Sequence, residues 1–171
     1  QTTAGSDALA KICVEWEQCV DSARAAGVRV VHPRTGIVLG TEGGALAKML
    51  PAFRAFVGGP LGSGRQWVPW VHRDDVVGAI TFAAECDRIV GPFNVAAPSP
   101  VRMRELARAI GGVLRRPSLM PVPAAALRLM LGGGAEALLT GQRAIPAKLL
   151  EAGYAFRFPA LEDALRDLLR S

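Results

Sequence analysis

One segment of the chain, residues 58–75, carries three structural signals in a row and reads GGPLGSGRQWVPWVHRDD. Its glycines allow the backbone to approach another chain segment or a ligand closely. The aromatic residues that follow are typical of a short strand. Asp74 and Asp75 suit the electropositive start of a helix, so we expect one of them to cap it. The segment therefore predicts a loop, a strand and a helix in direct succession.

The sequence on either side of this segment predicts an α/β protein. Upstream, apolar residues at helical spacing over 9–23 end at Gly27, and residues 28–32 form a β-branched strand. Downstream, a glycine–proline turn leads into a strand over 93–96. Helix, glycine and strand in this order make the back half of a βαβ unit, which belongs to a parallel sheet.

The remaining residues are interpreted as mostly helical. Residues 33–44 are expected to form a loop. The helix after this loop has Leu46, Met49, Leu50 and Phe53 on one face, and Pro51 within it should kink or break it. The helix that begins at the two aspartates should turn Val76, Val77, Ile80 and Ala84 inward. Two or three strands beside about seven helices are too few for a self-sufficient parallel sheet, so partner strands are expected N-terminal to Gln1 or from another chain. Further elements are expected as a short strand over 119–122 and as helices over 124–131, 135–140 and 146–152. Two more helices are expected to begin at prolines, one at Pro100 with its apolar face from Met103 to Leu114 and the last at Pro159.

The composition is that of a globular protein of 171 residues, of which half are hydrophobic and a fifth charged. No apolar run approaches the roughly 20 residues that span a membrane, and the first residues have no signal-peptide core, so we expect a cytoplasmic protein. Cys13, Cys19 and Cys86 have neither metal-ligand spacing nor an even number for a disulfide framework. The net charge of +5 comes mainly from arginines that alternate with leucine and alanine. Such a pattern favours solvated helix faces over nucleic-acid binding.

The glycine-rich loop over 58–64 does not have the pattern of a phosphate-binding loop. It contains no Walker sequence and does not lead from a strand directly into a helix. It is interpreted either as the edge of a ligand pocket or as a surface turn. His72 has no nucleophile elbow to serve, and adjacent aspartates diverge, so His72, Asp74 and Asp75 are expected to be structural.

Two further groups of residues are candidates for ligand contact. Trp67 and Trp70 should point to opposite faces of their strand, one toward a pocket and the other into the core. Arg34, Thr35 and Gly36 follow a strand end, where open α/β sheets place their ligands. Thr35 could hydrogen-bond an amide, and Gly36 would leave room for a flat ring. An ordinary exit from a strand into a loop explains the same residues equally well.

Taken together, these motifs resemble the atypical extended short-chain dehydrogenase/reductases known as sugar-nucleotide epimerase-like proteins, within the NAD-dependent epimerase/dehydratase superfamily. The resemblance runs in order along essentially the whole chain. It rests on Trp16-Glu17, RTGIVLG (34–40), GGAL (43–46), MLP (49–51), GGPLGSGRQ (58–66), WVH (70–72), Asp74-Asp75, GPFNV (91–95), GQRA (141–144) and Gly153-Tyr154.

In that family a Rossmann domain binds NADP(H), and a smaller, mostly helical domain closes over the substrate. The resemblance implies that this α/β chain is the C-terminal part of an extended Rossmann-fold dehydrogenase, with an incomplete parallel sheet and a mostly helical substrate domain. Residues 1–36 and 67–97 would belong to the Rossmann domain, and residues 37–66 and 98–171 to the substrate domain.

The resemblance also implies where ligands bind. Pro33, Arg34, Thr35 and Gly36 would lie near the nicotinamide, and Arg65, Gln66 and Trp67 would line the substrate pocket. The glycine fingerprint, the residues that hold the 2′-phosphate and the catalytic tyrosine would all precede Gln1, so NADP would be bound mainly by that absent portion. No catalytic residue or metal ligand is expected in this chain, and Tyr154, its one tyrosine, is not assigned the catalytic role.

The function that follows from the resemblance is that of an NADP-dependent oxidoreductase or epimerase-like enzyme. Its substrate would be a small carbonyl or hydroxyl compound or a sugar nucleotide. This chain alone would be inactive, because the N-terminal half of the same fold is missing. Its partners would be that N-terminal half and a small-molecule substrate, with no nucleic acid and no membrane. The alternative is a non-catalytic NADP-binding sensor or protein-interaction module on the same fold.

Overall fold

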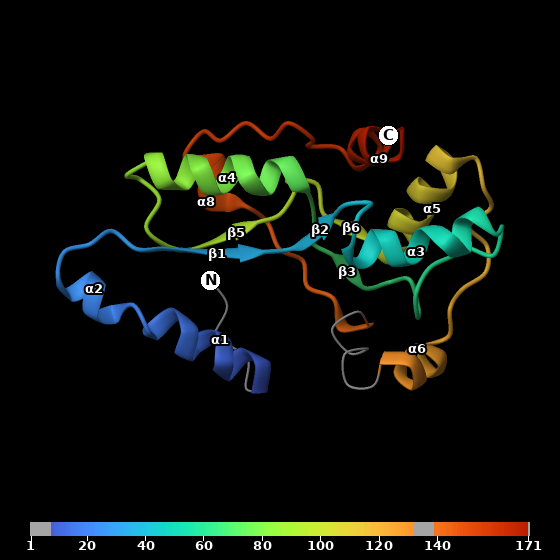
Figure 1. Ribbon diagram of the computed structural model, residues 1–171, viewed down its shortest axis with the longest axis horizontal. Helices are drawn as coiled ribbons and strands as arrows, with labels where there is room; N and C mark the ends of the chain where they lie inside the picture. Colours follow the sequence, from blue (N-terminus) through green and yellow to red (C-terminus); the bar gives the residue numbers. More distant parts are fainter. Residues whose placement is uncertain (1–7, 132–138, 171) are drawn as a thin grey trace.

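Strand pairing in the computed structural model, which describes residues 8–131 and 139–170, follows the α/β pattern (Figure 1). The elements in chain order are α1 (Ala8–Gln18), α2 (Asp21–Ala25), β1 (Val31–Thr35), β2 (Ile37–Leu39), α3 (Gly44–Arg54), β3 (Trp67–Val68), β4 (Trp70–His72), α4 (Arg73–Glu85), β5 (Gly91–Val95), β6 (Val101–Arg102), α5 (Met103–Leu114), α6 (Ala124–Leu131), α8 (Ala147–Glu151) and α9 (Leu161–Leu169).

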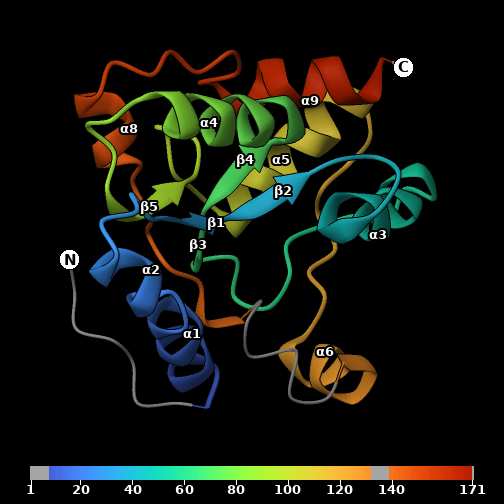
Figure 2. The same ribbon diagram turned by 60° about the vertical axis from the view of Figure 1, so that its left-hand side comes forward.

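Two parallel ladders lie end to end. β1 pairs with β5 from Val31↔Gly91 to Thr35↔Val95, and β2 pairs with β4. A single residue, Gly36, separates β1 from β2, and its amide donates to the carbonyl of Val95 at 2.9 Å. α4 lies over one face of the β1–β5 ladder and α1 over the other, as Figures 1 and 2 both show. Parallel strands with helices on both faces confirm the predicted fold class.

β1 begins three residues later than the strand predicted over 28–32. Val28 is still bonded to the preceding helical turn, with its amide donating to the carbonyl of Ala23 at 3.0 Å, and the guanidinium of Arg29 bonds carbonyls around the end of α4. The first contact with β5 is made by the carbonyl of Val30, which accepts a hydrogen bond from the amide of Gly91 at 2.9 Å. The loop predicted over 33–44 is therefore wrong in its first half, which holds the end of β1 and all of β2. The partners of these strands are 30 to 60 positions away along the chain, where a local pattern carries no signal about them.

α3 runs through Pro51 without a break, contrary to the prediction. A proline inside a helix costs about 3 kcal/mol. Four side chains of α3, however, are buried in the core, and each contributes about 1.5–3 kcal/mol by leaving water. Tertiary packing thus outweighs the local penalty. The four buried side chains are Leu46, Met49, Leu50 and Phe53.

The start of α4 also differs from the prediction. His72 is the N-cap residue, and its Nδ1 accepts a hydrogen bond from the amide of Asp74 at 3.1 Å. The two aspartates lie in the first turn, where their charges favour the helix dipole without capping it. Asp75, Ala79 and Ala83 face inward, whereas Val77 is 67% exposed, Ile80 is 45% exposed and Ala84 is exposed as well, contrary to the prediction for these three. Two small alanines let the helix lie close to the sheet, and the larger apolar residues are left on its outer face.

Two hydrophobic clusters make up the core of the described residues. One surrounds the β1–β5 ladder and includes Val71, Phe93 and Leu149. The other gathers α3, α5 and α9 around Trp70. The helices predicted over 124–131 and 146–152 are present as α6 and α8, whereas most of the helix predicted over 135–140 lies outside the described residues. The strand predicted over 119–122 is reduced to one bridge, between Val122 and Leu61. None of the helices within 8–131 and 139–170 is both long and apolar enough to span a membrane.

Candidate cofactor and substrate site

A cavity of about 1040 Å³ runs along β1 from Val31 to Thr35 and reaches past its carboxyl end to Gly36. All four residues predicted to lie near the nicotinamide, namely Pro33, Arg34, Thr35 and Gly36, line this cavity. Its other walls come from α1, from residues 92–94 of β5, from Pro69 and from residues 142–148. Ligands of open parallel sheets bind outside the carboxyl ends of the strands, so this cavity is a candidate ligand site.

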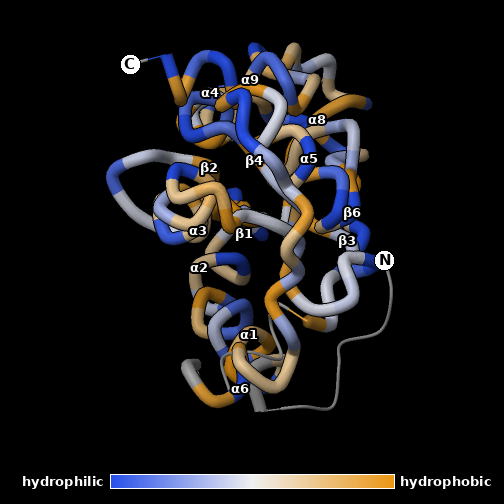
Figure 3. Tube along the Cα trace, turned by 90° about the vertical axis from the view of Figure 1, so that its right-hand side faces the viewer, coloured by the Kyte–Doolittle hydropathy of each residue, from blue (hydrophilic) through white to orange (hydrophobic). Residues whose placement is uncertain are grey.

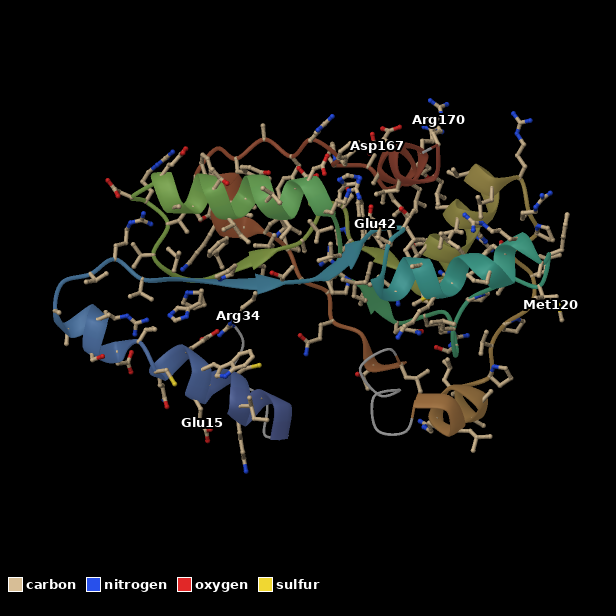
Figure 4. The ribbon with its side chains drawn as sticks, in the orientation of Figure 1. Glu15, Arg34, Glu42, Met120, Asp167 and Arg170 are labelled. Atoms are coloured by element: carbon tan, nitrogen blue, oxygen red, sulfur yellow. The ribbon has the colours of Figure 1, made fainter. Side chains whose placement is uncertain are left out.

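Arg34 extends from β1 toward α1 (Figure 4) and forms a bidentate ion pair with Glu17. Its Nε donates to Oε1 at 2.7 Å, and its Nη2 donates to Oε2 at 2.8 Å. These hydrogen bonds raise the pKa of Arg34 and lower the pKa of Glu17. The pair joins α1 to the strand and holds the two walls of the cavity together, so we interpret Arg34 as a residue that shapes the site.

Gly36 meets a neighbouring backbone rather than open space. A Cβ added there would lie 2.0 Å from the carbonyl oxygen of Pro69, which accepts a hydrogen bond from the amide of Ile37 at 2.7 Å. The glycine is therefore required by the close approach of two chain segments, and the room predicted for a flat ring at this position is taken by Pro69. Thr35 is exposed on the cavity side, where its hydroxyl can donate and accept hydrogen bonds.

Residues 142–148 form the far wall and are held against β5 by side chains. Asn94 Nδ2 donates to the carbonyl of Ile145 at 3.1 Å, and Lys148 Nζ donates to the carbonyl of Val90 at 2.7 Å. The cavity wall thus offers a ligand the exposed side chains of Pro33 and Thr35. The turn from β2 into α3, residues 40–44, carries three glycines, but it lacks the G-x-G-x-x-G spacing of a dinucleotide fingerprint and does not line this cavity.

The predicted substrate residues, Arg65, Gln66 and Trp67, have three different environments. Gln66 is buried, and its Nε2 donates to the carbonyl of Leu61 at 3.0 Å, so it supports the glycine-rich loop. Arg65 is exposed, and its carbonyl accepts a hydrogen bond from Arg102. Trp67 is half-buried. Trp70 fills the core, as predicted for one of the two tryptophans, with its Nε1 donating to the carbonyl of Ser99 at 3.0 Å.

The ring of Trp67 makes cation–π contacts with two arginines. The guanidinium carbon of Arg102 lies 4.3 Å from the centre of its ring, and that of Arg143 lies 5.3 Å away. Arg143 also lines the cavity at β1, so the same arginine contacts both Trp67 and this cavity. Sequence analysis missed Arg102, because nothing in the local pattern indicates that residues 35 positions apart meet.

The glycine-rich loop is packed against residues 118–122. Met120 N donates to Gly58 O at 3.2 Å, and Gly62 N donates to Val122 O at 2.9 Å. A Cβ on Gly59 would lie 2.1 Å from the carbonyl oxygen of Met120. Gly58 and Gly59 are buried, so the interpretation as a surface turn is wrong. The loop does edge a cavity, because Gly59 and Leu61 line an apolar one described below.

His72 and Asp75 are fully buried and join α4 to the C-terminal segment. Asp75 accepts hydrogen bonds from the amides of Arg157 at 2.7 Å and Phe158 at 3.0 Å. His72 Nε2 lies 3.3 Å from Oδ2 of Asp167 on α9 (Figure 4), in a geometry that is not a hydrogen bond. Burial lowers the pKa of His72, against the opposing effect of nearby aspartates. The neutral imidazole and the paired carboxylate thus both have structural roles, as predicted. The described residues hold no cluster of three or more His, Cys, Asp or Glu suited to a metal ion.

A Rossmann-like α/β fold with a cavity at a strand end is the arrangement in which nucleotide cofactors commonly bind. The model of the NAD dependent epimerase/dehydratase family matches residues 8–96, just over half of the chain, so the chain belongs to this family. A second family model, described only as a domain of unknown function, matches residues 122–168.

Individual relatives agree with this membership. The chain is 46% identical over 167 residues to the chloroplastic "Epimerase family protein SDR39U1 homolog" of Arabidopsis thaliana, an alignment that covers 98% of this chain and 48% of the relative. The structure of human epimerase family protein SDR39U1 with NADPH is 38% identical and superposes with a TM-score of 0.80, over 89% of this chain and 54% of that one. A nucleoside-diphosphate sugar epimerase from Corynebacterium glutamicum is 31% identical, with a TM-score of 0.72, over 99% of this chain and 32% of that one. The chain thus spans about half the length of the curated relatives it matches.

Proposed function

We propose that the chain supplies the nicotinamide-side wall and part of the substrate wall of an NADP-dependent oxidoreductase or epimerase-like enzyme. The observation that carries the proposal is the position of residues 33–36 along the cavity at the end of β1. The human relative whose structure holds NADPH supports NADP as the cofactor. When bound, the nicotinamide supplies or accepts a hydride at a carbonyl or carbinol carbon of a small or sugar-nucleotide substrate.

The roles of the chain's own residues in this proposal are binding and positioning. Thr35 presents its hydroxyl to the carboxamide, and the Arg34–Glu17 pair keeps α1 in place behind the ring. Trp67, with Arg65 and Gln66 beside it, belongs to the substrate side. Arg143 and Arg102 place positive charge near Trp67, which suits a substrate that carries an anionic group.

The remainder of the cofactor site is proposed to come from an N-terminal half of the same fold. Within the described residues, β1 has a strand partner on one edge only. On α1, Trp16 is 73% exposed and Ile12 48% exposed. An exposed strand edge beside exposed apolar side chains suits further strands and helices of the same domain. In this proposal the Rossmann portion comprises residues 1–36 and 67–97, and residues 37–66 and 98–171 form the substrate domain.

The test is a titration of the full-length protein with NADPH and with NADH, followed by reduced-nicotinamide fluorescence. We expect NADPH to bind, and Thr35→Trp to weaken this binding at least about tenfold, a loss of about 1.4 kcal/mol, because the indole fills the cavity wall. Val28→Trp places the same ring on an exposed residue outside this cavity and should leave binding unchanged. Failure of the wild-type protein to bind either cofactor would overturn the proposal.

A further inference from the structure

An apolar cavity of about 330 Å³ lies between α3, α5, β2 and the glycine-rich loop. The wall of this cavity includes Leu46, Met49 and Phe53 from α3 and Met103 and Leu106 from α5. Figure 3 shows the molecule from the side on which α3 lies. Among the described residues that line the cavity, Lys48 is the one charged side chain. Such a wall offers a ligand almost no hydrogen-bonding side chain.

This wall selects against polar ligands. A sugar or phosphate that enters it would lose hydrogen bonds to water without gaining partners, at a cost of several kcal/mol. An apolar group gains about 0.8 kcal/mol for each methylene that it buries. The wall is also well supported, because Leu46, Phe53 and Leu106 are each almost completely buried in the core.

The apolar cavity adjoins the candidate cofactor cavity through consecutive residues. Ile37 and Val68 line the apolar cavity, whereas their chain neighbours Gly36 and Pro69 line the larger one. A hydrogen bond of 2.7 Å from Ile37 N to Pro69 O fixes these two segments together. The two cavities therefore lie on either side of this junction, which brings a ligand in the apolar cavity next to residues that line the larger one.

The volume sets the size of the occupant. An engineered apolar cavity of about 150 Å³ holds one benzene ring. A cavity of 330 Å³ is about twice as large and accommodates roughly ten to twelve carbon atoms.

We propose that this cavity binds the aliphatic or aromatic part, of roughly ten carbon atoms, of the substrate, with the polar end of that substrate directed toward Gly36. The assignment to a substrate rests on the proposed function, whereas the binding of an apolar group rests on the cavity alone. The substrate is therefore an alcohol or carbonyl compound with an apolar part of this size, and the anionic group that Arg102 and Arg143 suit belongs to its polar end. A sugar nucleotide without such an apolar part does not fill the site.

The methionine methyl groups provide a direct test. The full-length protein carries ¹³C-labelled methionine methyls and is titrated with linear alkan-1-ols from butan-1-ol to dodecan-1-ol, with and without NADPH. We expect the signals of Met49 and Met103 to shift while that of Met120, which is exposed and outside the cavity, stays in place. The dissociation constant should fall about fourfold per added methylene and level off near ten carbons.

Matched variants locate the binding. Ala52 lines the cavity and Ala55 is exposed just beyond the end of α3. Ala52→Phe should therefore weaken decan-1-ol binding at least about tenfold, and Ala55→Phe should not. The wild-type titration gives the answer by itself if Ala52→Phe fails to fold. An affinity independent of chain length, or shifts that bypass Met49 and Met103 in a protein that binds NADPH, would overturn this inference alone. Alkanol binding by a protein that binds neither nicotinamide cofactor would overturn the proposed function and leave the apolar site standing.

Discussion

Replacement of Asp75 by asparagine tests whether this buried carboxylate fastens the C-terminal segment to α4. The side chain is 1% exposed and accepts the amides of Arg157 and Phe158 at 2.7 and 3.0 Å, one on each oxygen. Asparagine has almost the same size but only one acceptor oxygen. Its NH₂ group would therefore face a backbone N–H that has lost its partner.

The magnitude follows from these two hydrogen bonds. A hydrogen bond to a charged group contributes about 1.5–3 kcal/mol, and a buried donor left unsatisfied costs about 1–3 kcal/mol. We therefore expect Asp75→Asn to lower the free energy of unfolding by about 2–4 kcal/mol. Asp74→Asn is the matched control, because Asp74 is 40% exposed and its ion pair with Arg157 spans 3.1 Å at the surface. Such exposed pairs contribute about 0–1 kcal/mol.

The assay is urea unfolding of the full-length protein and both variants, with amide hydrogen exchange at residues 157 and 158. In Asp75→Asn these two amides should exchange faster, whereas in Asp74→Asn they should stay protected. A stability change below about 0.5 kcal/mol for Asp75→Asn, or unchanged protection of both amides, would refute the reasoning.

Three further outcomes follow from the same contacts. Burial lowers the pKa of His72 below its usual 6.5, so the unfolded chain binds the proton more readily than the folded one. Stability should therefore fall as the pH drops below about 6.5. His72→Asn, which keeps an N-cap acceptor, should flatten the dependence of the urea midpoint on pH between pH 7.5 and 5. Burial, followed by Asp75, raises the pKa of Tyr154 to about 12. The stability that goes with this shift should be present below pH 10 and lost toward pH 12, and the 295 nm absorbance difference from Tyr154→Phe should show no ionisation at pH 10; half-ionisation there would contradict it. Gly36→Ala should cost about 2–4 kcal/mol in urea unfolding, because the new Cβ meets Pro69 O at 2.0 Å, and a near-neutral result would show that the two segments separate easily.

The α/β class and the amphipathic helices could be predicted from local pattern. The positions of buried residues in α5 and α9 repeat at helical spacing. β5 was predicted two residues late, because the glycine–proline pair expected to form a turn is the start of the strand. β2 could not be predicted in the same way, because its partner, β4, lies more than thirty positions along the chain. The predicted break of α3 at Pro51 was wrong, because helix propensity does not take account of the burial of Phe53 and its neighbours in the core.

The candidate site, too, could be predicted from the sequence only in part. Position after an expected strand end indicated only residues 34–36 and left an ordinary strand exit open, and the family resemblance selected residues 33–36. The structure places 33–35 within β1 and brings all four residues together on one wall. The reason for Gly36 could not be found from the sequence, because Pro69 approaches it from a different strand. The cap of α4 was assigned to an aspartate by residue type, although the imidazole of His72 fills that position. Arg102 and Arg143 meet Trp67 only through tertiary packing.

The position of the nicotinamide is the central claim, and a nuclear Overhauser measurement tests it most directly. The full-length protein, with its threonine methyl groups labelled, is saturated with NADPH, and Thr35→Ser identifies the methyl signal of Thr35. Magnetisation transfer from the nicotinamide ring protons to the Thr35 methyl group, strongest among the threonines, is the predicted result. Bound NADPH whose ring protons transfer to other methyl groups and not to that of Thr35 would contradict the account.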